Sequence, residues 1–373
     1  MFRFLFVLQA LIVAIDLKAM LPLKSNLANV VEKVFILLTG VAMLATRPAQ
    51  RGVLVLIFAM VVLAYLCALG TDYYGFEWRL FFGGIVSIVA PFILLAAEPN
   101  EQDRLLGLRV FAAWPIAMTL IGITYAVAGL APIYQTDYMG TERFSTTQGS
   151  AFLAGACFIG MFASLELAER RHFGYASLFV INLGVLVLTA SRTPLALALA
   201  VCGIVFLASF KRFPLMKMLT PVYFFLGAGI FLTFFGSDLV RRFESGKMSG
   251  RDVLWGIIQR QLDAHPWFGV GLGNQQLLIP KAITEQTTTI AAHNEFLRFA
   301  VELGYPGAAV FFALTLGLFL VVWNSAAVKR DPIFLVCMTA FYLFCLTDNV
   351  FSRPHYFFIM VAALFASRAR TAE

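Results

Sequence analysis

The chain has 373 residues, of which 60% are hydrophobic and only 13% are charged, and its mean hydropathy is +0.84. A soluble domain carries roughly a quarter charged residues, so this composition excludes an ordinary soluble globular protein. The net charge of +7 does not indicate nucleic-acid binding, because the Lys and Arg residues stand in small clusters between apolar runs.

Apolar runs of roughly 20 residues, the length that crosses a bilayer core of about 30 Å, divide most of the chain. They predict an all-α polytopic membrane protein with about twelve transmembrane helices. The predicted spans are residues 4–23, 27–45, 52–69, 78–97, 105–130, 150–168, 173–189, 193–210, 218–235, 306–328, 332–346 and 354–367.

Basic residues mark alternate short loops between these spans, so the positive-inside rule predicts that those loops and both termini are cytoplasmic. The longest segment on the opposite side lies between the ninth and tenth spans. The chain is thus expected to comprise spans 1–9 in residues 1–235, an outer, catalytic segment with amphipathic helices in residues 236–305, and spans 10–12 with a cytoplasmic tail in residues 306–373. The basic clusters are Arg47 and Arg51, Arg170 and Arg171, Lys211 and Arg212, Lys329 and Arg330, and Arg368 and Arg370.

The outer segment contains a predicted amphipathic helix that begins at Arg251, with Ser249 and Gly250 as its cap. We expect this helix to lie at the membrane surface. The Gly269–Gly273 run that follows is expected to form a flexible turn; it is no dinucleotide fingerprint, because no strand and helix of a βαβ unit flank it. The predicted apolar face of the helix consists of Val253, Leu254, Ile257, Ile258 and Leu262.

Two arginines stand at the outer side, where charges near span ends are costly and tend to be functional. Arg192 lies in a very short turn between two spans, which places its guanidinium at the depth of lipid headgroups; the alternative is an ordinary interfacial arginine. Arg251 is either functional or merely the solvated start of the amphipathic helix.

Two further outer residues could supply acid–base chemistry. The neutral imidazole of His293 is well suited to accept a proton near neutral pH, although a lone histidine is more often a packing or surface residue. His265 and His355 compete for this role. Asp348, at the outer end of a span, could orient a histidine or pair with an arginine, or be an ordinary end-of-span residue.

Together these residues suggest more than each does alone. Arginines bind diphosphate through planar bidentate hydrogen bonds and stay charged at any working pH. Two arginines beside one base suit transfer from a diphosphate-linked lipid to a hydroxyl. We expect no metal and no cofactor, because the outer segments show no Asp-x-Asp or His/Cys ligand cluster.

The order of four motifs resembles the O-antigen ligase and polymerase superfamily. In the most specific of them, nine residues separate His293-Asn294 from Gly304, and Gly307 follows. The resemblance covers roughly residues 189–307, and the layout of the spans extends it along the chain. The other motifs are Ser191-Arg192-Thr193, Ser249-Gly250-Arg251 and the run His265-Pro266-Trp267-Phe268-Gly269-Val270-Gly271-Leu272-Gly273.

This resemblance implies a membrane glycosyltransferase fold of the GT-C kind in the bacterial inner membrane, with its active site facing the periplasm. It implies that Arg192 and Arg251 engage the diphosphate of an undecaprenyl-linked O-antigen and that His293 is the base for the acceptor hydroxyl. Asp348 matches an acidic family position, and Arg143 matches a position in an outer loop. The ligases transfer the glycan to lipid A-core oligosaccharide, with inversion at the anomeric carbon.

Several alternatives remain open at this point. An O-antigen polymerase and a protein O-oligosaccharyltransferase use the same donor lipid and share the histidine segment, but the close His/Gly pattern and compact loops favour the ligase. A transporter or flippase would show charges at mid-span and broken, paired helices, of which the sequence has few. A purely structural scaffold would leave the outer arginines and His293 without purpose.

Overall fold

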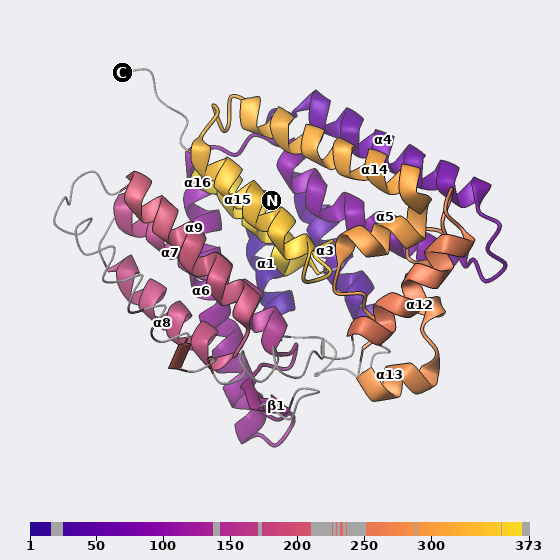
Figure 1. Cartoon of the computed structure of the whole chain (residues 1–373). Coiled ribbons are helices and arrows are strands. Elements are labelled where there is room, and N and C mark those ends of the chain that lie inside the picture. The colour runs from indigo at the N-terminus through magenta and orange to yellow at the C-terminus, as the bar shows by residue number, and fades with distance from the viewer. Residues whose placement is uncertain are drawn as a thin grey trace. The chain divides into compact units, whose positions relative to one another are not determined.

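The computed structural model describes residues 1–15, 25–136, 142–170, 174–209, 226, 229, 232, 233, 236, 251–287, 289–351 and 353–367. These residues are mostly helical (Figure 1). They belong to two compact units: the first consists of residues 1–6, 26–100 and 249–373, and the second of residues 7–25 and 101–248. Helix α1 (Phe2–Ile15) begins in the first unit and continues into the second.

The first unit is built around two long helices, α4 and α14, which lie side by side (Figure 1). Every third or fourth residue of α4 is buried, as in Val53, Ile57 and Met60, whereas Phe58 and Leu69 on the other side are exposed. An exposed side this apolar is typical of a helix that faces lipid. The unit contains α3 (Ser25–Leu44), α4 (Arg51–Gly70), α5 (Trp78–Ile93), η1 (Leu94–Ala96), α12 (Arg251–Ala264), η2 (Asn274–Leu278), α13 (Lys281–Thr287), α14 (Glu295–Asn324), α15 (Pro332–Cys345) and α16 (Pro354–Ala366).

In the second unit, helix α7 packs against α6, α8 and α9. In its most apolar stretch, 89% of the residues are buried inside the protein, so α7 is the core of this unit. A short antiparallel hairpin pairs Tyr134 with Phe144 and Thr136 with Glu142, which adds two strands that the all-α prediction did not include. The elements are α6 (Glu101–Val127), β1 (Tyr134–Thr136), β2 (Glu142–Phe144), α7 (Ser150–Arg170), α8 (Tyr175–Leu188) and α9 (Arg192–Ser209).

The prediction of a polytopic helical protein is confirmed, while the span count of twelve and the GT-C architecture stay predictions. Five helices in the described part of the chain are long and apolar enough to cross a membrane: Arg51–Gly70, Trp78–Ala96, Glu101–Val127, Ser150–Glu169 and Glu295–Asn324. Shorter apolar helices are Phe2–Ile15, Tyr175–Leu188, Arg192–Ala208, Pro332–Cys345 and Tyr356–Ala366. The predicted span 218–235 lies almost wholly outside the described residues, as do Ser249 and Gly250.

Helix α14 consists of two helical parts that meet at a kink: the end of the predicted outer segment (residues 236–305) and the tenth predicted span (residues 306–328). It kinks at Gly304, whose φ of 73° and ψ of 169° are not helical. A Cβ at this position would lie 2.3 Å from the carbonyl oxygen of Trp267, so only glycine allows this approach. Three backbone hydrogen bonds close the contact: Val270 N to Val301 O (2.8 Å), Gly271 N to Glu302 O (2.9 Å) and Tyr305 N to Pro266 O (2.9 Å).

The structure contains the predicted turn at Gly269–Gly273, but the turn is closely packed against α14, which contradicts the prediction that it is flexible. Gly269 has a φ of 69°, and a Cβ there would lie 2.5 Å from the carbonyl oxygen of Val301. The glycines allow the turn to press against the backbone of α14 rather than to move freely.

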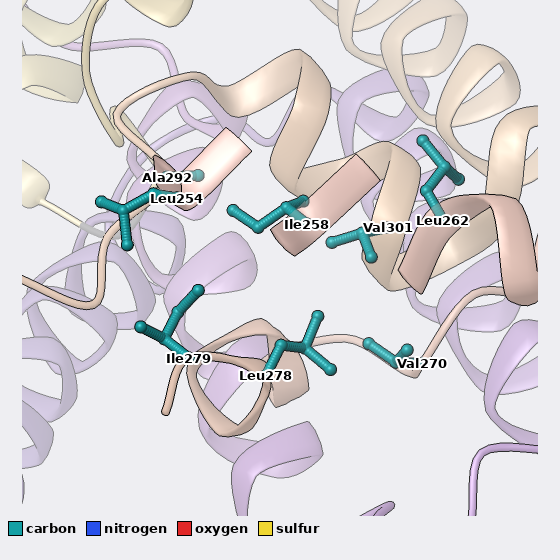
Figure 2. Packing of buried hydrophobic residues seen from close by; sticks show 8 residues of the cluster. All are labelled: Leu254, Ile258, Leu262, Val270, Leu278, Ile279, Ala292 and Val301. Carbon is teal, nitrogen blue, oxygen red and sulfur yellow. The ribbon is translucent and has the colours of Figure 1, made fainter. Parts of the chain in front are cut away.

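The segment between α12 and α14 has a small hydrophobic core of its own (Figure 2). Its side chains come from α12, from the turn after it, and from the chain on either side of His293. The predicted apolar face of α12 is confirmed for Leu254, Ile258 and Leu262, which are buried, and is wrong for Val253, which is exposed. The cluster consists of Leu254, Ile258, Leu262, Val270, Leu278, Ile279, Ala292 and Val301.

Candidate active site

His293 lies immediately before α14 in a backbone conformation that L-residues rarely adopt, with a φ of 49°. Asn294 begins the helix: its side-chain Oδ1 accepts a hydrogen bond from the backbone N–H of Leu297, at 3.1 Å. On the other side, the indole Nε1–H of Trp255 donates to the carbonyl oxygen of Ala292, at 2.7 Å. His293 is thus held from both sides in a left-handed conformation, of a kind that concentrates at functional sites.

The imidazole of His293 has a partner at each ring nitrogen. Nδ1 lies 3.3 Å from Oδ1 of Asp348, and Nε2 lies 3.4 Å from the hydroxyl of Thr289. A carboxylate at Nδ1 favours the tautomer that carries its proton there. Nε2 is then the ring nitrogen that can accept a proton. The prediction that Asp348 orients a histidine agrees with this geometry.

Asp348 is held by three donors. The hydroxyl of Tyr356 donates to Oδ2 at 2.6 Å, the backbone N–H of Asn349 donates to Oδ1 at 2.8 Å, and His293 is the third donor. Burial acts to raise the pKa of Asp348, but the hydrogen bonds from His293, Tyr356 and Asn349 outweigh it and hold the pKa well below the ordinary 3.8. The carboxylate is therefore ionised at neutral pH.

Arg251, the first residue of α12, lies in the first unit, and its positive charge acts on the hydroxyl of Tyr356. Three of the five predicted site residues, His293, Asp348 and Arg251, therefore belong to this unit, and His293 and Asp348 are in direct contact. Their elements are α12, the start of α14 and the loop between α15 and α16.

The other two predicted residues, Arg192 and Arg143, belong to the second unit. Arg192 begins α9 after a turn in which Ala190 has a positive φ of 53°, and it is half-buried. Arg143 is also half-buried and pairs with Gln135 in the β1–β2 hairpin.

The competing candidate His265 has an acidic partner of its own. Its Nδ1 lies 2.5 Å from Oδ1 of Asp72, and its ring meets that of Tyr73 edge to face. The hydrogen bond from His265 lowers the pKa of Asp72. Unlike Asp348, Asp72 is largely exposed, with 80% of its side chain accessible. The side chain of His355 lies outside the described residues.

Sequence reasoning missed a buried row of charges on α14. Arg298 bonds to Glu295 and lies 3.6 Å from Glu302. Oε1 of Glu295 also accepts the backbone N–H of Phe351 at 2.7 Å, which ties the Asp348 loop to α14. The spacing i, i+3, i+7 placed these charges on one helix face and was the available signal.

Tyr356 was also missed, and the sequence held little to reveal it. It has no charge, and it stands eight residues after its partner, so no local pattern marks it.

In the part of the chain that the structure describes, no group of three or more His, Cys, Asp or Glu residues could hold a metal ion.

Residues 177–312 match the family model described as O-Antigen ligase. This segment is therefore similar to the O-antigen ligase family. This confirms the resemblance found in the motifs, and the matching segment includes Arg192, Arg251 and His293. No curated protein matches the chain.

Proposed function

We propose that this chain is an O-antigen ligase, which transfers a glycan from undecaprenyl diphosphate to lipid A-core oligosaccharide on the periplasmic side of the inner membrane. The observation that carries the proposal is the His293–Asp348 pair: an imidazole in a strained backbone, inside the segment that matches the O-antigen ligase model, is backed by an ionised carboxylate that follows this segment in the chain. Both termini are then cytoplasmic, as the basic loops predict.

In the proposed reaction, Nε2 of His293 accepts the proton of the acceptor hydroxyl as its oxygen bonds to the anomeric carbon. The bond from that carbon to the diphosphate breaks, and the electron pair leaves with the diphosphate. Attack opposite to the leaving group inverts the anomeric configuration. Asp348 stabilises the imidazolium that forms, as the carboxylate of a catalytic triad does.

The leaving diphosphate gains charge as the glycosidic bond breaks. The positive charge of Arg251 acts on the hydroxyl of Tyr356, and we assign Arg251 to this diphosphate together with Arg192. Bidentate hydrogen bonds from guanidinium groups stabilise such charge more in the transition state than in the ground state. Arg143 is a further ligand on this proposal.

An acceptor-dependence assay tests the function. We expect the purified chain, given donor lipid, to form a ligated product only when lipid A-core oligosaccharide is present. A polymerase would instead lengthen the glycan on the donor lipid alone, and a protein O-oligosaccharyltransferase would need a protein acceptor. The two products differ in the lipid that they carry, which mass spectrometry distinguishes. Elongation of the donor without acceptor would refute the ligase and favour the polymerase.

We also predict that transfer needs no divalent metal, because the arginines take the place that a cation has in metal-dependent transferases. Full activity is expected in excess EDTA, measured as ligated product per unit time against an untreated sample. A loss of activity that added magnesium or manganese restores would contradict this assignment.

A further inference from the structure

Tyr356 provides the shortest contact to Asp348, although neither the family motifs nor the proposed mechanism uses it. It lies at the start of α16 and is 2% exposed. Its ring packs on Phe344, with centroids 4.9 Å apart, and its hydroxyl donates to Oδ2 of Asp348 at 2.6 Å.

The hydroxyl matters because of how the two oxygens of Asp348 are used. Oδ1 accepts from His293 and from the backbone of Asn349, while Oδ2 accepts from Tyr356. The terminal torsion of an aspartate is broad and is poorly fixed by its own rotamer. A second anchor on Oδ2 therefore sets the plane of the carboxylate and aims Oδ1 at the histidine.

Tyr356 also stands among the charges that surround the pair. Arg251, from α12, and Arg353, from the loop before α16, both act on its hydroxyl. The charges of Glu295, from α14, and Asp348 also act on each other.

We propose that Tyr356 is a positioning residue of the transfer reaction: its hydroxyl fixes Asp348 against His293. The inference rests on the proposed function, in which His293 is the base and Arg251 binds the diphosphate. A base held in line with the acceptor hydroxyl reacts faster than one free to turn.

Tyr356→Phe tests the proposal, because it keeps the ring on Phe344 and removes only the hydroxyl. We expect kcat to fall about 10- to 100-fold, the effect of one hydrogen bond to a charged group, with KM for donor and acceptor changed less than about threefold. The acid limb of the kcat profile belongs to the His293–Asp348 pair. It should move to higher pH, since a carboxylate with one donor fewer holds the proton of the pair more strongly.

Tyr342→Phe is the matched control. The hydroxyl of Tyr342, in α15, is buried and has no hydrogen-bond partner among the described residues. Its removal should leave both kcat and the pH profile unchanged, and thermal unfolding of the full chain in nanodiscs should show both variants folded. A purely structural role of Tyr356 predicts a lower unfolding temperature with the wild-type pH profile.

A double-mutant cycle shows whether Tyr356 acts through Asp348. In an Asp348→Asn background, Tyr356→Phe should cost less than about twofold. An undiminished loss in that background, or wild-type kcat and pH profile in Tyr356→Phe alone, would overturn the proposal. His293→Ala, measured in parallel, reports on the proposed function separately: wild-type transfer by that variant removes the base itself, whatever Tyr356 does.

Discussion

His293→Ala is expected to slow single-turnover glycan transfer by about 10²- to 10⁴-fold, the usual contribution of general acid–base catalysis, while the donor lipid still binds. The variant loses the only proposed acceptor for the hydroxyl proton, but it removes no proposed contact to the diphosphate. Binding and chemistry should therefore separate. Donor binding and single-turnover transfer are measured on the same preparation.

His265→Ala is the comparison for this prediction, because His265 also pairs with an aspartate, Asp72. We expect it to retain transfer within a few-fold of wild type once folding has been checked. Wild-type transfer by His293→Ala, combined with a large loss in His265→Ala, would reassign the base to the His265–Asp72 pair.

Arg192→Ala is expected to reduce both donor affinity and the rate of transfer, with a loss in rate of about 10²- to 10³-fold. The diphosphate is charged in the bound donor and gains charge as the bond breaks, so an arginine that contacts it acts at both stages. Arg192→Lys keeps the charge but loses the planar pair of donors, and it should recover only part of the loss. Arg251→Ala should behave like Arg192→Ala.

Arg109→Ala controls for the loss of a positive charge, because Arg109 is an exposed arginine of α6 in the same unit. It should bind donor and transfer glycan as the wild type does. Full recovery by Arg192→Lys would show that charge alone suffices. Unchanged donor binding in Arg192→Ala would remove Arg192 from the diphosphate site.

Much of the helical fold could be predicted because the thickness of the bilayer sets the number of consecutive apolar residues that a transmembrane helix needs. The span predicted at 52–69 corresponds to α4 (Arg51–Gly70), and that at 78–97 to α5 with η1, which end at Ala96. Glycine followed two residues later by proline marks a helix boundary, and the non-helical Gly304 in α14 agrees with this signal. The backbone pairing of this junction with the Pro266–Gly271 segment could not be predicted, because no local pattern encodes it.

A residue of the candidate site could be predicted where a charged or titratable side chain stands at the outer end of a predicted span. His293, Asp348 and Arg251 were identified because charged or titratable groups are costly at the outer ends of spans. Tyr356 and Trp255 act through a hydroxyl and an indole, which are ordinary among so many aromatic residues. Their roles depend on contacts between distant elements, such as Trp255 with Ala292, which no local pattern encodes.

The close backbone pairing of the Pro266–Gly271 turn with α14 at Gly304 has a consequence for local unfolding. The three amide hydrogens that donate across this pairing, those of Val270, Gly271 and Tyr305, exchange with solvent when the turn and α14 separate. That separation would also open the small core formed by Ile258 and its neighbours. The turn, α12 and the start of α14 should therefore open as one cooperative unit, in which the backbone around His293 loses its order together with them.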